Sequence, residues 1–154
     1  MSIFPTKILL ATDGSGEAEL ALHTAVDLAK STNSELHILT VGSDYHLARE
    51  MKSKYAEFFR EAFQTLERET QQILDEQAEK VEKAGGRVAE AHLRMGGQQD
   101  RNIVSLAEEI EAGLIVMGSR GLGGIRRALM GSVSDSVVRH AHCPVLVVRR
   151  EEGR

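Results

Sequence analysis

The stretch LIVMGSRGLGGIRRALMGSVSDSVV, from Leu114 to Val138, joins three structural signals. It opens with the continuous apolar run LIVMG, which is typical of a strand buried on both faces of a parallel sheet. Five glycines then occur from Gly118 to Gly131, and the segment Val133–His142 predicts a helix. Because glycine weakens helices and strands alike, its crowding between these two elements needs a reason.

The glycine-rich stretch has two interpretations. In the first, it is a mobile surface loop whose serine caps the next helix. In the second, it is a phosphate cradle, because the free N–H groups and the dipole at a helix start favour an anion. Ser132 and Ser134 would add hydroxyl donors, and Arg120, Arg126 and Arg127 place positive charge nearby. The residues alone leave both interpretations open. The P-loop and G-x-G-x-x-G patterns are absent, so neither an ordinary P-loop NTPase nor an NAD enzyme is supported.

Outward from this stretch, apolar strand runs alternate with segments of helical periodicity. This alternation predicts one open α/β domain over residues 1–154, with a parallel sheet covered by helices on both faces. The expected strands are Lys7–Thr12, Glu35–Val41, Arg87–Met95, Leu114–Gly118 and Pro144–Val148. The expected helices are Glu17–Lys30 with Ser15 as N-cap, Leu47–Ala84 as one helix or as two with a break at Glu69–Gln72, Ile103–Ile110 and Val133–His142.

Three loops are the candidate ligand-binding loops. In open α/β sheets, ligands bind beyond the carboxyl ends of the strands, at a topological switch point. The loops after Thr12, Val41 and Met117 follow such strand ends. Asp13, in the first of them, can accept hydrogen bonds from ribose hydroxyls, and its alternative role is an Asx-turn or a helix cap.

Composition excludes several function classes. The chain has 154 residues and a formal net charge of -4, which argues against broad electrostatic binding to nucleic acid or an anionic membrane. No apolar run approaches the ~20 residues of a membrane span, and the start lacks the pattern of a secretory signal. Cys143 is the only cysteine, so no internal disulfide can form, and a cytoplasmic protein is expected.

Other chemistry-bearing residues form no convincing centre. His140, His142 and Cys143 are close in sequence, but two histidines two residues apart on a helix point to different faces, so no metal site is predicted. Cys143 is expected to be a small buried hydrophobe. No paired carboxylates and no Ser-His-Asp set emerge, so the catalytic residues are unknown and at most slow hydrolysis is expected.

Gly118, Gly121, Gly131 and Ser132 match the spacing G-x2-G-x9-G-[S/T] at every position. This pattern resembles the nucleotide motif of the universal stress protein family, and members that do not bind ATP lack it. The segments KILLATDGSGEAELAL and HAHCPVLVVR also resemble that family, so the similarity covers essentially the whole chain. It differs at Ala11, where some ATP-binding relatives have proline, and at Gly113, where aspartate is common.

The resemblance implies a Rossmann-like five-stranded parallel sheet with strand order 3-2-1-4-5 and a bound adenine nucleotide, ATP or else ADP or AMP. It places adenosine against Ala11, Thr12 and Asp13, with Val41 on the adenine. Mg²⁺ or Mn²⁺ would bridge phosphate oxygens, with water as its other ligands. The residues implied around the ribose and the phosphate chain are Met117, Gly118, Gly121, Gly131, Ser132, Val133 and Ser134.

The expected function is therefore that of an ATP-binding stress-response protein whose occupancy acts as a signal. One alternative is a slow ATPase or autophosphorylating protein, with Ser132 and Ser134 as candidate acceptors. Another is a nucleotide-free dimeric interaction module. The apolar last strand is an expected sheet edge, which invites pairing, and the resemblance implies a homodimer through Val145–Val148.

Overall fold

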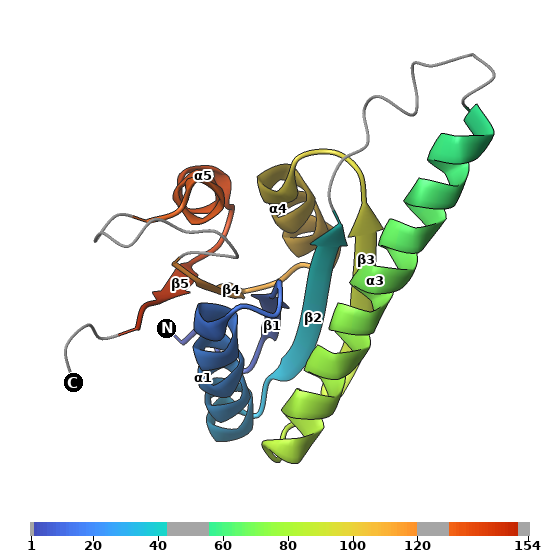
Figure 1. The fold of residues 1–154 in the computed structure, drawn as a ribbon. Coiled ribbons are helices and arrows are strands. Elements are labelled where there is room, and N and C mark those ends of the chain that lie inside the picture. Colours follow the sequence, from blue (N-terminus) through green and yellow to red (C-terminus); the bar gives the residue numbers. More distant parts are fainter. Residues whose placement is uncertain (1, 43–55, 120–129, 151–154) are drawn as a thin grey trace.

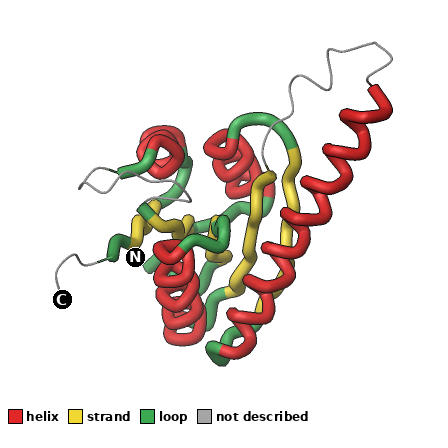
Figure 2. The backbone as a smooth tube through the Cα atoms, viewed as in Figure 1, coloured by secondary structure: helices red, strands yellow, loops and turns green. Residues whose placement is uncertain are grey.

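The computed structural model describes residues 2–42, 56–119 and 130–150 and contains a five-stranded parallel sheet with helices on both faces (Figure 1). The strand order β3-β2-β1-β4-β5 confirms the prediction. The strands are β1 (Lys7–Ala11), β2 (Glu35–Gly42), β3 (Val88–Met95), β4 (Leu114–Gly118) and β5 (Val145–Val148). The helices are α1 (Gly16–Thr32), α3 (Ala56–Lys83), α4 (Gln99–Glu109) and α5 (Ser132–His140). Among the described elements, strands and helices alternate along the chain (Figure 2).

The central strand β1 divides the hydrophobic core into two layers, because successive side chains of a strand point to opposite faces. Ile8 and Leu10 pack under α1 and α3, whereas Leu9 and Ala11 pack under α4 and α5. The first three are fully buried, and full burial of one such side chain is worth about 1.5–3 kcal/mol. These two apolar layers hold the carboxyl ends of the strands in place.

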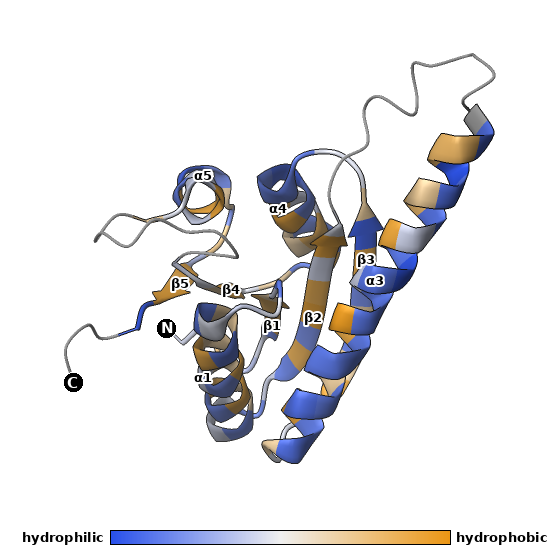
Figure 3. Ribbon diagram, viewed as in Figure 1, coloured by the Kyte–Doolittle hydropathy of each residue, from blue (hydrophilic) through white to orange (hydrophobic). Residues whose placement is uncertain are grey.

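The helix α3 runs without interruption through Glu69–Gln72, so the one-helix alternative is correct in the described residues. Its buried stripe of Thr70, Leu74, Gln77 and Val81 recurs at steps of three and four residues, as expected for a helix lying on a sheet. The outer face of α3 is largely hydrophilic (Figure 3). The predicted start at Leu47 lies outside the described residues.

Two helix termini test the predicted signals. Ser15 caps α1 as predicted, since its Oγ accepts a hydrogen bond from the N–H of Ala18 at 3.2 Å. The predicted range of α5 needs correction. The helix ends at His140, because Ala141 is extended with φ -64° and ψ 142°.

In the parts of the chain that the structure describes, no helix combines the length and apolarity needed to cross a membrane.

Candidate functional site

The topological switch point lies between β1 and β4. These strands are neighbours, although their connections run to opposite sides, and Ala11 pairs with Met117 near their carboxyl ends. The N–H of Thr12 donates to the carbonyl oxygen of Leu39 in β2 at 2.9 Å. The loop after β1 and the start of the glycine-rich stretch therefore lie side by side, as the sequence predicts.

Four of the predicted site residues belong to one apolar cluster on the α4 and α5 side of the sheet. Ala11 and Met117 are buried in it, whereas Val41 and Val133 are only partly buried. Val41 stands next to the last residue of β2, so its accessible part is at the carboxyl edge of the sheet. A half-buried apolar surface of this kind suits a flat, largely apolar group.

Asp13 shapes the loop between β1 and α1. One of its carboxylate oxygens, Oδ1, accepts a hydrogen bond from the N–H of Ser15 at 2.9 Å. This is the Asx-turn that the sequence offered as the alternative role. Between these two residues, Gly14 has a φ of +78°, a backbone conformation that residues with a Cβ rarely adopt. A role of Asp13 at a ribose stays a prediction.

The side chain of Thr12 holds α3 against the sheet. It is buried, and its hydroxyl donates to Oε1 of Gln77 at 2.8 Å. Gln77 lies in the buried stripe of α3. The hydrogen bond therefore satisfies two buried polar groups that have lost their contact with water. The hydroxyl of Thr12 is thus part of the scaffold beneath the loop.

Gly118 has a packing role that the sequence reading did not include. A Cβ at this position would lie 3.1 Å from the backbone carbonyl carbon of Glu17 and 3.2 Å from the backbone nitrogen of Ala18. Glycine at the end of β4 therefore allows the first turn of α1 to approach the sheet. The resemblance to the family implied only that Gly118 lies near the ribose and the phosphates.

The two ends of the glycine-rich stretch are bonded to each other. The carbonyl oxygen of Ser119 accepts from the N–H of Gly131 at 2.6 Å and from the hydroxyl of Ser134 at 2.8 Å. The hydroxyl of Ser119 in turn donates to the carboxylate of Glu17. The start of α5 is thereby tied to the start of α1. Gly121 and the three arginines of this stretch lie outside the described residues.

The N-terminus of α5 has no side-chain cap among the described residues. Its N-cap, Gly131, has φ -62° and ψ 160° and brings no side chain that could accept a hydrogen bond from the first amides, which lack intrahelical partners. Ser132 is exposed, whereas Ser134 is buried with its hydroxyl donated to Ser119. The start of α5 combines free amide donors with the positive end of a helix dipole.

The expectation that His140, His142 and Cys143 hold no metal stays a prediction. Nδ1 of His140 lies 2.8 Å from the carbonyl oxygen of Ser136. Cys143 is half-buried in the apolar cluster, and its burial raises the pKa of the thiol.

In the described ranges, the side chains close enough to share a metal ion are instead His37, Glu90 and His92. The sequence reading missed this group, which we call the histidine cluster. The signal that could have revealed it is the pattern E-x-H, which occurs in two strands, at Glu35 to His37 and at Glu90 to His92.

The sheet order and the loops gathered at its switch point define an open, doubly wound α/β protein. Residues 5–149 match the model of the Universal stress protein family, and the chain belongs to that family. This membership confirms the resemblance seen in the sequence.

Individual relatives agree with the family assignment. A putative universal stress protein of Staphylococcus aureus is 37% identical over 145 residues, covering 94% of this chain and 84% of the relative. The solved structure of hypothetical protein MJ0577 aligns with a TM-score of 0.81 at 28% identity, covering 98% of this chain and all of that one. A universal stress protein solved in complex with cAMP aligns with a TM-score of 0.67 at 26% identity, covering 96% of this chain and 99% of that one.

Proposed function

We propose that this chain is an ATP-binding universal stress protein whose nucleotide occupancy acts as a signal. The observation that carries the proposal is the N-terminus of α5, which has no side-chain cap and begins at Gly131, tied to the switch point through Ser119. Val133 at this terminus packs against the same apolar cluster as Val41, which contains Ala11. The cAMP complex of a structural relative supports an adenine nucleotide as the ligand class.

In this proposal, adenine packs on Val41 and the ribose lies near Asp13. The phosphates lie over Gly118 and against the first amides of α5, those of Ser132, Val133 and Ser134, and Gly121 is expected to contact them too. Mg²⁺ or Mn²⁺ would enter with the phosphates.

Calorimetric titration of the nucleotide-stripped chain with ATP and Mg²⁺ tests the proposal. We expect micromolar or tighter binding of about one nucleotide per chain, because free amides and a helix dipole act together on the phosphates. Parallel titrations with ADP and AMP rank the nucleotides. Absence of heat at two temperatures would overturn the proposal in favour of a nucleotide-free interaction module.

The slow ATPase or autophosphorylating alternative uses the same pocket. Of the two candidate acceptors, Ser132 is exposed, whereas the hydroxyl of Ser134 is buried and already donated. Transfer of phosphate to Ser134 would require that bond to break, so Ser132 is the acceptor that this geometry favours.

We further propose a homodimer through the edge strand β5. Val147 of this strand is half-buried, while its neighbours Val145, Leu146 and Val148 pack on the two core layers. A half-exposed apolar edge strand invites pairing with another chain. Light scattering at micromolar concentration should give twice the mass of one chain. Val147→Lys should reduce it to one chain mass, because an edge lysine opposes strand pairing.

The matched control is Phe58→Lys on α3, since Phe58 is 69% exposed and places the same new charge on a different element. The control should stay dimeric. A wild-type mass of one chain, or a dimer disrupted only by Phe58→Lys, would contradict the β5 interface.

A further inference from the structure

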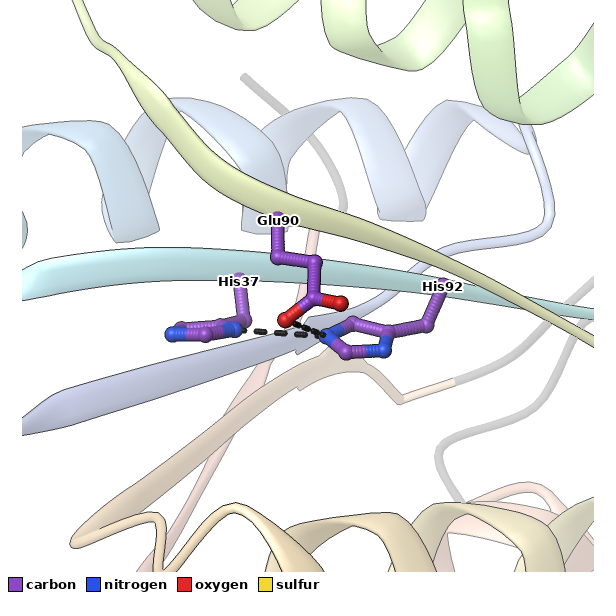
Figure 4. A group of neighbouring side chains, drawn as sticks. All are labelled: His37, Glu90 and His92. Carbon is purple, nitrogen blue, oxygen red and sulfur yellow. Dashed lines mark hydrogen bonds and ion pairs between the residues drawn. The ribbon is translucent and has the colours of Figure 1, made fainter.

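The histidine cluster lies on neighbouring strands β2 and β3, away from the loops of the proposed nucleotide site. Figure 4 shows the side chains of His37, Glu90 and His92 turned toward a common point. Nδ1 of His37 lies 3.2 Å from Nε2 of His92, and that nitrogen lies 3.7 Å from Oε2 of Glu90. One ligand atom from each of the three side chains falls within 4.8 Å of the other two.

A β-bulge brings the three side chains to one face of the sheet. Leu36 pairs with Val88, but the next residue of β2, His37, pairs with Glu90, so Ala89 is skipped. A shift of one residue moves every later side chain of a strand to the opposite face. Without the bulge, Glu90 and His92 would face α3, and His37 would face the other side. Bulges of this kind often re-aim side chains at functional sites.

We propose that the histidine cluster binds a divalent transition-metal ion such as Zn²⁺, with Nδ1 of His37, Nε2 of His92 and a carboxylate oxygen of Glu90 as ligands. Around a tetrahedral Zn²⁺ with bonds of about 2.0–2.1 Å, two ligand nitrogens lie about 3.3 Å apart. The observed separation of the imidazole nitrogens is 3.2 Å. The side chain of Glu90 is 63% exposed, so its carboxylate can turn toward the ion.

Glu35 supplies the support that metal-binding histidines usually have. Its Oε2 lies 3.2 Å from Nε2 of His37, on the side of the ring away from the proposed ion. A carboxylate in this position accepts a hydrogen bond from the Nε2–H of the ring, so the Nδ1 lone pair is left for the metal. Such a partner is a positioning residue, because it orients the ligand without touching the ion.

The charges around the cluster favour a cation. Glu35 and Glu90 each lie within 4 Å of one of the two imidazoles. Arg94, the nearby cation on β3, is paired with Glu109 of α4 at 2.5 Å, which offsets its charge. When no metal is bound, the N–H of one imidazole donates a hydrogen bond to the ring nitrogen of the other. A bound ion would replace this hydrogen bond.

Such a site is separate from the proposed nucleotide site. His37 and Val41 are four residues apart on β2, which corresponds to roughly 13 Å along a strand. A metal held by both strands would clamp the edge strand β3 to β2. The three protein ligands leave a fourth position, which water fills in most zinc sites of this composition.

The test is a titration of the untagged, EDTA-treated, nucleotide-free chain with ZnCl₂, followed by calorimetry and by thermal unfolding. We expect one Zn²⁺ per chain. A ligand that binds only the folded state raises its stability, so Zn²⁺ at about a hundred times its Kd should raise Tm by roughly 5–10 °C. Glu90→Gln and His92→Gln should each lower the Zn²⁺ affinity at least tenfold. Glu35→Gln should lower it by about 10–100-fold, as expected for the loss of a supporting carboxylate.

The matched control is His23→Gln, which removes an exposed histidine of α1 and should leave Zn²⁺ binding unchanged. Tm in EDTA checks that each variant is folded, and the exposed Glu90→Gln variant is the one least able to disturb the fold. The proposal is overturned if wild type gains no stability from Zn²⁺, or if Glu90→Gln and His92→Gln both bind it with wild-type affinity. In the second case the bound metal resides elsewhere on the chain.

Discussion

Joint replacement of Gly121 and Gly131 by valine is expected to abolish ATP binding, with an affinity loss of at least about a hundredfold, while the chain stays folded. The proposed site assigns both glycines to the phosphates, and a branched side chain at each would block the approach of the phosphates to the backbone. Gly131 has φ -62° and ψ 160°, which valine adopts without strain, and its N–H can still donate to Ser119. Calorimetry measures the binding, and thermal unfolding checks the fold.

Ser132→Ala is the matched control for this double variant. It removes one exposed hydroxyl and leaves the amides in place, and loss of a single hydrogen bond of about 1 kcal/mol lowers affinity only about fivefold. A folded double variant that binds ATP within threefold of wild type would show that the phosphates bind elsewhere. A Ser132→Ala variant as weak as the double variant would move the main contact from the backbone to the hydroxyl.

Gly118→Val is expected to lower the free energy of unfolding by about 2–3 kcal/mol and Tm by about 5–10 °C. The Cβ alone would lie 3.1 Å from the backbone of Glu17, and two further methyl groups increase the overlap. Because the obstacle is helix backbone, α1 itself would have to move away from β4. Thermal and urea unfolding measure the loss of stability. ATP affinity should also fall, because the loop after β1 leads directly into α1 and would move with it.

Gly16→Val tests whether the loss of stability depends on what the new side chain meets, helix backbone or a flexible side chain. A Cβ at position 16 would lie 2.9 Å from a guanidinium nitrogen of Arg150, which is the far end of a flexible side chain and can turn away. This variant should therefore stay within about 2 °C of wild type. If both valine variants lose equal stability, the contact of Gly118 with α1 is not the reason for glycine at the end of β4.

Much of the fold could be predicted from local patterns. The apolar runs and the helical periodicity place each described strand and helix within a few residues of its observed bounds, because burial imposes periods of two and 3.6 residues on the sequence itself. The cap at Ser15 is equally local, since it involves a residue and an amide three positions away. The strand order came from the resemblance to the family.

The candidate site was predictable only in part. The spacing of Gly118, Gly131 and Ser132 located the loop, and the sheet does bring Ala11, Val41 and Met117 together in one apolar cluster. The bond from Thr12 to Gln77 joins residues 65 positions apart, and no local pattern encodes such a contact. The packing of Gly118 on α1 likewise depends on how closely a helix approaches a strand.

The sequence by itself determined which segments become strands and helices, where α1 begins and which loop holds the spaced glycines. Each of these features depends on residues that are close together in the chain. Only the tertiary structure decided which side chains meet across strands. The bulge that skips Ala89 puts His37 on the same face as Glu90 and His92. The physical reason is that a strand has a side-chain period of two, so pairing shifted by a single residue reverses every contact, and that register arises from the packing of the whole sheet.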